Sequence, residues 1–247
     1  MRLDIYLYKK NFVSSRSKAC ELIKSGKIKI NGKIILKPSY NMEDLEYKIE
    51  ILEDKVYVGR AAYKLKFFLQ SLNLDIENSV CLDIGSSTGG FTQILLEFKV
   101  KEVYAVDVGK DQLHPLLKSN PKVKSFEKTD IREFKCNKKF NLVVCDVSFT
   151  GIENILPKMD EFATDKIILL FKPQFEVGKN AKRNKKGVVT DKKAIKEAEK
   201  RFEKSIEQYK WQLIAKEESK IKGKEGNVET FYYFRKKRDR SDSSGRI

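Results

Sequence analysis

Histidine is almost absent from this sequence, which has His114 as the only one among 247 residues. This scarcity disfavours a catalytic triad built on histidine and a metal site made of several histidines, so no metal is predicted. The four cysteines contain no C-x-x-C pair, and most of them lie in or beside apolar runs. We therefore expect buried thiols in a reducing compartment. They are Cys20, Cys81, Cys136 and Cys145.

Long apolar runs are also missing. No run approaches the roughly 18 residues that a membrane-spanning helix needs, and the N-terminus has no apolar signal segment. The sequence therefore predicts a cytoplasmic protein without stable membrane association.

Acidic residues are outnumbered by basic ones. The chain has 51 Lys and Arg against 35 Asp and Glu, a formal net charge of +16. Long-range attraction by this charge concentrates polyanions around the protein, and nucleic acid is the first candidate partner. A hydrophobic share of 40% is enough for a real core in one large domain or two.

The run from Cys81 to Phe91 is typical of a buried strand, a glycine-rich turn and the start of a helix. Glycines let the backbone approach a ligand closely, and the first N–H groups of the helix point toward it. A second apolar run ends in Asp107, close to the spacing of about 20 residues at which an acidic residue accepts a ribose hydroxyl. This pattern favours a nucleoside pocket over a tight turn without a ligand.

Neither G-x-G-x-x-G nor G-x-x-x-x-G-K-[ST] occurs in the chain. A nucleoside without phosphates is therefore favoured over a dinucleotide or a nucleoside triphosphate.

Strand-like runs alternate with helical segments between residues 79 and 171, which predicts an α/β fold with a parallel, doubly wound, Rossmann-like sheet. Ligands bind at the carboxyl ends of such strands. The residues expected at that edge are Gly85, Asp107, Asp130, Asp146 and Lys172. Helices are also predicted over 60–72, 111–118 and 192–209, and the last two strands over 211–215 and 228–234.

Residues 178–187 form a polar, basic loop without periodicity. A solvated loop is the first interpretation, and a clamp for an RNA backbone is the second.

Residues 2–52 form a small α+β module with two short helices, the second capped by Ser14 or Ser15 and ended by Gly26. Asn31-Gly32 predicts a hairpin turn between two strands. Basic residues crowd this module, which suggests a face that contacts phosphates. A solvated surface would explain any one of them.

The pattern Arg2-Leu3-Asp4, Ser15-Arg16, Asn31-Gly32 and Lys37-Pro38, with Ala19, Leu22-Ile23 and Gly26, resembles the S4 RNA-binding domain. This resemblance implies that the module docks on structured RNA. The predicted RNA-binding residues are Arg2, Arg16, Lys18, Lys37 and, after the module, Arg60.

A pocket for adenosine without phosphates suits S-adenosylmethionine. In this interpretation the turn 85–90 lines the amino-acid part, Asp107 contacts the ribose and Asp130 the adenine edge. The methyl group is already activated, so the enzyme must align a nucleophile and, for an alcohol, remove a proton. Lys172 at a strand end is the candidate base, because a dry lysine beside another cation can lose its proton. The predicted donor-binding residues are Asp83, Gly85, Ser86, Ser87, Thr88, Gly89, Gly90, Phe91, Asp107, Asp130 and Asp146.

The second part of the chain resembles the FtsJ-type ribose 2′-O-methyltransferases, and the whole chain resembles the TlyA family of ribosomal RNA cytidine 2′-O-methyltransferases. The matching motifs are Arg60-Ala61-Ala62-Tyr63-Lys64-Leu65, Cys145-Asp146-Val147-Ser148-Phe149, Phe171-Lys172-Pro173-Gln174-Phe175-Glu176 and Gly226-Asn227-Val228-Glu229. The resemblance implies a catalytic set of Lys64, Asp146, Lys172 and Glu229, with Lys172 as the base. From its own segment, Lys64 would be a solvated helix residue.

One departure is visible. Many members have Ser-Arg-Gly-Gly before the first lysine, whereas this chain has Gly59-Arg60-Ala61-Ala62. The departure concerns the geometry of the linker more than catalysis.

These patterns predict an S4-like domain over residues 1–55, a linker over 56–60, a methyltransferase domain over 61–235 and a charged tail over 236–247. The expected partner is ribosomal RNA or a ribosomal subunit. The chain begins almost directly at the S4 pattern, which resembles the shorter class of the family and implies large-subunit RNA. Two alternatives stay open: a non-catalytic S4-type RNA-binding protein, and a membrane-lytic haemolysin.

Overall fold

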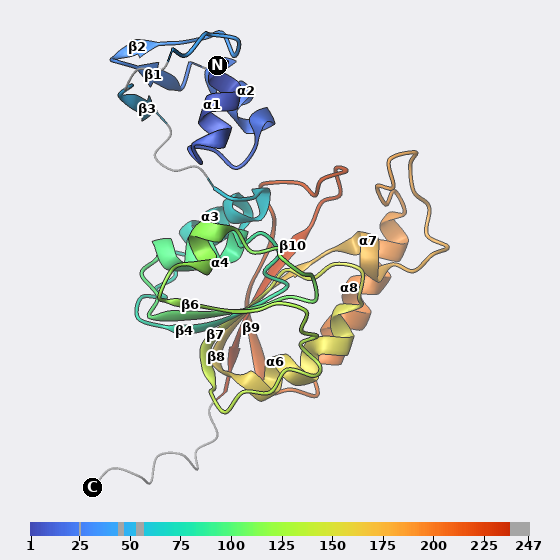
Figure 1. Cartoon of the computed structure of the whole chain (residues 1–247). Coiled ribbons are helices and arrows are strands. Elements are labelled where there is room, and N and C mark those ends of the chain that lie inside the picture. Colours follow the sequence, from blue (N-terminus) through green and yellow to red (C-terminus); the bar gives the residue numbers. More distant parts are fainter. Residues whose placement is uncertain (25, 44–46, 53–56, 238–247) are drawn as a thin grey trace, which may run out of the picture. The chain divides into compact units, whose positions relative to one another are not determined.

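The computed structural model describes residues 1–24, 26–43, 47–52 and 57–237. The chain forms two compact units, Met1–Gly59 and Arg60–Ile247 (Figure 1). Residues 238–247 of the predicted tail, and residue 56 of the predicted linker, lie outside the described residues.

The first unit contains two helices and a small antiparallel sheet. The helices are α1 (Leu3–Lys9) and α2 (Arg16–Lys24), and the strands are β1 (Ile28–Ile30), β2 (Lys33–Ile34) and β3 (Ile49–Ile51), in the order β2-β1-β3. Its core consists of Leu3, Leu7, Val13, Ala19, Leu22, Ile23, Ile28, Ile30 and Met42.

Local sequence signals of the first unit act as predicted. Ser15 caps α2, since its hydroxyl oxygen accepts a hydrogen bond from the backbone N–H of Lys18 at 3.1 Å. Asn31 and Gly32 both have positive φ, 50° and 80°, which gives the tight hairpin turn between β1 and β2. The strand β3 was not predicted.

The second unit is built on a seven-stranded sheet with the order β6-β5-β4-β7-β8-β10-β9. The strands β4 (Val80–Ile84), β5 (Glu102–Val106), β6 (Val123–Phe126), β7 (Phe140–Cys145) and β8 (Ala163–Phe171) are parallel. The last two strands, β9 (Trp211–Glu218) and β10 (Thr230–Lys236), are antiparallel, and β10 lies between β8 and β9. The predicted doubly wound α/β fold is confirmed.

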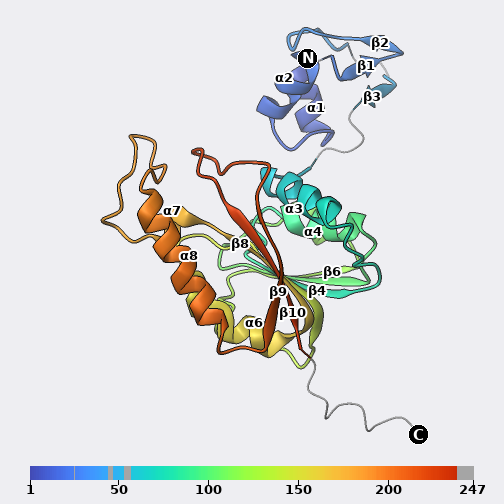
Figure 2. The same cartoon turned by 180° about the vertical axis from the view of Figure 1, so that it is seen from behind.

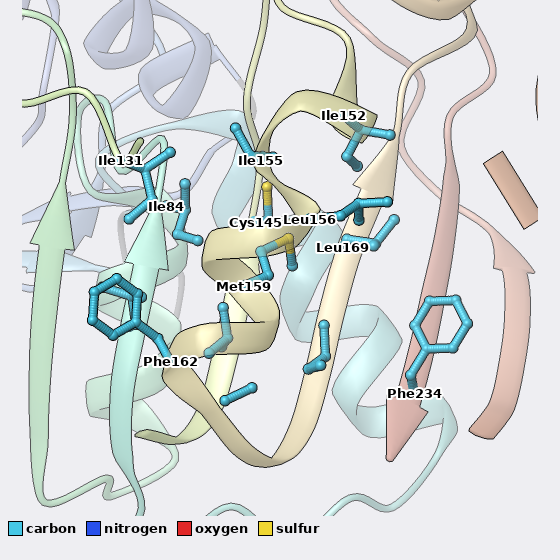
Figure 3. Packing of buried hydrophobic residues seen from close by; sticks show 14 of the residues in the cluster. Ile84, Ile131, Cys145, Ile152, Ile155, Leu156, Met159, Phe162, Leu169 and Phe234 are labelled. Carbon is cyan, nitrogen blue, oxygen red and sulfur yellow. The ribbon is translucent and has the colours of Figure 1, made fainter. Parts of the chain in front are cut away.

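Helices cover both faces of this sheet (Figures 1 and 2). One face carries α3 (Arg60–Ser71) and α4 (Gly90–Glu97), and the other carries α6 (Leu156–Phe162) and α8 (Lys192–Ile206). On the α6 face, Met159 and Phe162 of the helix pack with Leu169 and Phe234 of the strands (Figure 3). The short segments are α5 (Pro115–Lys118), the 3₁₀ turn η1 (Ile152–Ile155) and α7 (Pro173–Glu176).

The helix predicted over 111–118 is shorter in the structure. Pro115 begins α5, and the ring Nδ1 of His114 accepts a hydrogen bond from the N–H of Leu116 at 3.3 Å. Asp111 has a left-handed φ of 52°, which a helix cannot accommodate. The helix α6, η1 and α7 were missed, because their short apolar stretches have no clear period.

Candidate active site

A cavity of about 540 Å³ lies at the carboxyl ends of the parallel strands. Gly85 follows β4, Asp107 follows β5 and Asp146 follows β7, and all three line it. Asp130 and Ser87 line it as well. The parallel topology thus brings these predicted residues together, in a volume typical of small-ligand sites.

The Asp107 carboxylate is held in place by two backbone amides. Its Oδ2 accepts a hydrogen bond from the N–H of Ser87 at 2.8 Å, and its Oδ1 accepts one from the N–H of Gly109 at 2.7 Å. Each oxygen keeps a second lone pair. The fixed carboxylate can therefore accept hydroxyl groups of a ribose.

The charge of the cavity suits a cation and not a phosphate. Its lining contains Asp107, Asp130 and Asp146, while the one guanidinium of the lining, Arg132, forms a bidentate ion pair with Asp130. That pair holds the pKa of Asp130 below its usual range. The Asp107 carboxylate, which is held by backbone amides alone, fits a methyl donor that carries a sulfonium and an ammonium group.

Two glycines of the predicted donor-binding turn serve packing. A Cβ added to Gly89 would lie 2.3 Å from the Leu117 side chain, and a Cβ added to Gly90 would lie 2.9 Å from the backbone nitrogen of Ala62. Gly90 therefore lets α4 approach α3 closely, in addition to its place at the helix start. The predicted donor-binding residues that do not line the cavity are Asp83, Ser86, Thr88, Gly89, Gly90 and Phe91.

Asp83 is fully buried beneath this turn. Its Oδ2 accepts a hydrogen bond from the Thr92 hydroxyl at 2.6 Å, while its Oδ1 has no hydrogen-bond partner. Burial raises the pKa of Asp83 to about 7, against which the Thr92 hydrogen bond acts only in part.

Replacing Asp83 with asparagine is expected to change how stability depends on pH. The folded-state pKa of about 7 lies above the usual value of 3.8, so the folded protein holds the proton more tightly and loses stability as the pH rises from about 4 to about 7. The asparagine variant lacks this loss, which amounts to roughly 2–4 kcal/mol. Thermal melts without donor from pH 5 to pH 8 should show the variant gaining several degrees on the wild type. A difference in melting temperature that stays constant with pH would contradict the assignment.

Lys172 follows β8 and meets Asp146 at the cavity. Its Nζ lies 2.7 Å from Oδ1 of Asp146 and donates hydrogen bonds to Ser148 Oγ at 2.9 Å and to the Asp146 carbonyl at 3.2 Å. Both residues are nearly excluded from solvent. Burial raises the pKa of Asp146, and the charges of Lys172 and Lys64 counteract this rise only in part.

Lys64 and Glu229 form a second buried ion pair. The Lys64 ammonium lies 2.5 Å from Oε2 of Glu229, and the two side chains are 10% and 3% exposed. The interpretation of Lys64 as a solvated helix residue is therefore wrong. Because the charge of Lys64 acts on Asp146, the two ion pairs are close enough to form one cluster of two cations and two anions.

The packing of α3 on β10 explains why this pair forms. Lys64 and Phe68 are four residues apart on α3, a rise of about 6 Å. Glu229 directly precedes β10 and is two residues from Phe231, a rise of about 6.7 Å for extended backbone. The rings of Phe68 and Phe231 stack with centroids 4.5 Å apart. Matching rises along helix and strand then bring Lys64 against Glu229.

Three residues near the cluster were not predicted. Gln174 donates a hydrogen bond from Nε2 to Oε1 of Glu229 at 2.9 Å, and Ser148 accepts one from Lys172. Phe149 lines the cavity, is 91% exposed and has a positive φ of 64°. An exposed aromatic ring on strained backbone beside a cavity is a signal that only the structure can give.

The predicted RNA-binding residues of the first unit include two arginines that share one carboxylate. Arg2 and Arg16 contact the fully buried Asp4 through their Nε atoms at 3.0 and 2.7 Å. Burial alone would raise the pKa of Asp4, but the hydrogen bonds from Arg2, Arg16 and Cys20 hold it below its usual range. The remaining guanidinium nitrogens lie on half-exposed side chains that can contact phosphates.

The other candidates have separate partners. Lys18 pairs with Glu21 at 2.9 Å, and Lys37 is exposed. In the second unit, Arg60 donates to the carbonyl of Lys222 at 2.8 Å.

S-adenosylmethionine-dependent methyltransferases have this sheet and an acid-lined cavity of this kind at its carboxyl edge, and the chain is one of them. The model of the FtsJ-like methyltransferase family matches residues 57–236, and the model of the S4 domain matches residues 1–43. A Campylobacter jejuni protein named 23S rRNA (cytidine-2′-O)-methyltransferase TlyA is 47% identical, over 95% of this chain and 99% of the relative. The chain therefore belongs to the TlyA family of FtsJ-like methyltransferases.

Two further comparisons agree with this assignment. A Mycobacterium tuberculosis protein named 16S/23S rRNA (cytidine-2′-O)-methyltransferase TlyA is 33% identical, over 98% of this chain and 92% of the relative. A solved structure described as a “putative hemolysin” from Streptococcus thermophilus has the same fold, with a TM-score of 0.69 and 30% identity, covering 96% of this chain and 88% of that one. The predicted family, fold class and methyl donor are confirmed.

Proposed function

We propose that this enzyme methylates the ribose 2′-oxygen of a cytidine in large-subunit ribosomal RNA, with Nζ of Lys172 as the general base. The observation that carries the proposal is the pair of buried ion pairs Lys172–Asp146 and Lys64–Glu229, because Asp146 lines the cavity and the charge of Lys64 acts on it. A lysine amine that is held in place by a carboxylate can remove the proton of a hydroxyl group, so this site needs no histidine as a base.

Each member of the cluster has a role in this proposal. S-adenosylmethionine supplies the electrophilic methyl group and a positive charge. The charges of two lysines and two carboxylates cancel, so the additional positive charge of the bound donor favours the loss of a proton from a lysine. Lys172 then removes the proton of the ribose hydroxyl, while Asp146 and the Ser148 hydroxyl hold its amine in place. The charges of Lys64 and Glu229 set the electrostatic potential at Asp146.

The residues that hold the donor are also proposed from the geometry. Asp107 would bind the ribose hydroxyls and Asp130 the adenine edge, as their places on the cavity lining allow. Asp83 is buried and does not line the cavity, so its proposed part in donor binding is to hold the glycine turn through its hydrogen bond with the Thr92 hydroxyl.

The RNA substrate is proposed from the S4 unit and from the relatives. The relative with 47% identity is named for 23S RNA, whereas the one with 33% identity is named for both RNAs, which favours the large subunit. The exposed ring of Phe149 at the cavity also suits a nucleobase, because aromatic rings stack on bases of any sequence.

The non-catalytic alternative has less support. A non-catalytic RNA-binding protein would have no need for two buried ion pairs beside a cavity, since burying charges is costly unless they serve a purpose. Among the described residues, every helix is too short or too polar to span a bilayer. The cytoplasmic location stays a prediction.

Mapping 2′-O-methyl groups tests this function directly. Ribosomal subunits and deproteinised RNA that lack the modification are incubated with the protein and S-adenosylmethionine, and both RNAs are then mapped. We expect one new methyl group on a cytidine ribose of the large-subunit RNA. Methylation of a base, or of no nucleotide, would refute the proposal, and methylation of both RNAs would refute its large-subunit part.

Replacing Arg2 and Arg16 together with glutamine is expected to weaken RNA capture about tenfold or more and to make it less dependent on salt, because two phosphate contacts are lost. Donor affinity should stay unchanged. Filter binding over a salt series and calorimetry with the donor measure the two effects. Asp4→Asn is the matched control, since it removes the shared carboxylate and keeps both guanidiniums. Equal loss of RNA and donor binding in the double variant would contradict the proposed division of labour.

A further inference from the structure

The segment 178–190, here called the basic hairpin, is an ordered structure and not a featureless loop. Arg183 and Val189 form a β-bridge, and the N–H of Thr190 donates to the carbonyl of Lys182 at 2.9 Å. The turn at its tip is closed by Asn184, whose Oδ1 accepts hydrogen bonds from the N–H groups of Lys186 and Val188 at 2.9 and 3.0 Å. The hairpin therefore has a defined shape.

The basic hairpin carries positive charge and no acidic residue. Its cations are Lys179, Lys182, Arg183, Lys185 and Lys186, and all of them are exposed. An ordered, purely cationic element beside an RNA-modifying site is complementary to a phosphate backbone.

Asn227 connects the basic hairpin to the site. It is 5% exposed, and its Oδ1 accepts a hydrogen bond from the N–H of Val189 at 2.9 Å. Its backbone carbonyl accepts one from the N–H of Gly223 at 2.8 Å, which closes a turn. That turn encloses the Glu229 carboxylate, because a Cβ added to Gly223 would lie 2.7 Å from Oε1 of Glu229.

A second connection reaches the same carboxylate. Arg183 donates from Nη2 to the carbonyls of Gln174 and Gly178, both at 3.1 Å, and the Gln174 side chain donates to Oε1 of Glu229. The hairpin is thus attached on both sides to the groups that hold Glu229.

We propose that the basic hairpin binds the phosphate backbone of the RNA and that Asn227 is a positioning residue that couples this binding to Glu229. The inference rests on the proposed function and assigns it a second RNA-binding surface, within the catalytic unit. RNA held on the hairpin steadies Asn227, and through it the Glu229–Lys64 pair.

The experiment compares the wild type with four variants. The hairpin variant is Lys182→Gln/Lys185→Gln/Lys186→Gln, and its charge-matched control is Lys99→Gln/Lys101→Gln/Lys122→Gln. The other two variants are Asn227→Ala and Asn227→Ala combined with the hairpin variant. The control lysines are exposed and lie just before β5 and β6, at the amino-terminal ends of these strands, opposite the cavity. RNA binding is measured over a salt series with a large-subunit RNA fragment and without donor, and kcat and KM are measured for methyl transfer.

We expect the hairpin variant to raise the KM for RNA about tenfold and to reduce the salt slope of binding by about 2 to 3, with the control variant unchanged. Asn227→Ala should lower kcat about tenfold, because a buried N–H of Val189 loses its acceptor and Glu229 loses its support. In the combined protein, kcat/KM should fall by less than the product of the two single reductions in kcat/KM, since both changes break the same connection between the hairpin and Glu229.

Equal salt slopes for the hairpin and control variants would overturn the assignment of the phosphate surface. A reduction in kcat/KM of the combined protein that equals the product of the two single reductions would overturn the coupling through Asn227. The first result does not depend on the proposed reaction, because the salt slopes need no methyl transfer. A wild type that binds RNA but modifies no ribose would refute the proposed function and leave the binding surface in place.

Discussion

Replacing Lys172 with alanine is expected to lower the rate of methyl transfer about a thousandfold or more, because removal of a positioned general base forfeits factors of 10²–10⁴ and this lysine also neutralises Asp146. The fold should survive. Burial already raises the pKa of Asp146, so its carboxyl can take up a proton when its partner is lost. Single-turnover transfer of a labelled methyl group to large-subunit RNA measures the rate, and calorimetry measures donor binding.

Lys158→Ala is the matched control for this prediction. Lys158 lies on α6, pairs with Glu161 at 2.8 Å and does not line the cavity, so its loss should leave the rate unchanged. An unchanged rate in the Lys172 variant, with donor binding intact, would refute the assignment of the base.

Replacing Lys64 with methionine is expected to destabilise the protein by about 3 kcal/mol, because Glu229 is then left charged and buried without its cation. The rate of methyl transfer should fall about a hundredfold, since the cation also acts on Asp146. Denaturant unfolding and the methyl-transfer assay measure the two quantities.

The double variant Lys64→Met/Glu229→Gln separates the two effects. It removes both charges and keeps an acceptor for the Gln174 amide, so most of the lost stability should return. The rate should stay low, because the field around Asp146 is not restored. A double variant that regains both stability and rate would show that the pair is structural only.

The sequence was sufficient to predict the residues at the carboxyl edge of the parallel strands. Each of β4, β5 and β7 is a mostly apolar run followed by a glycine or an aspartate, and parallel strands in a doubly wound sheet end on the same side. Gly85, Asp107 and Asp146 therefore reach the cavity for a reason that is visible in a single sequence.

The other half of the site depends on packing that no local pattern encodes. Lys64 looks like a surface lysine of an amphipathic helix, and its burial follows from the stacking of Phe68 on Phe231. Gln174 lies in the short helix α7 and Asn227 in a loop, and the hydrogen bonds of both side chains are defined only by the fold. In the same way, Gly90 was given a ligand role from its motif, whereas its neighbour in space is the backbone of Ala62.

The insertion of β10 between β8 and β9 has a consequence for biosynthesis. The two partners in the Lys64–Glu229 pair are 165 residues apart in the chain, and all side chains that line the cavity precede the last two strands. A nascent or prematurely ended polypeptide can therefore assemble the donor pocket while its reactive centre still lacks one acid. In the proposed mechanism, the catalytic set is therefore complete only when the hairpin of β9 and β10 docks against the edge of β8, after nearly the whole chain has been translated.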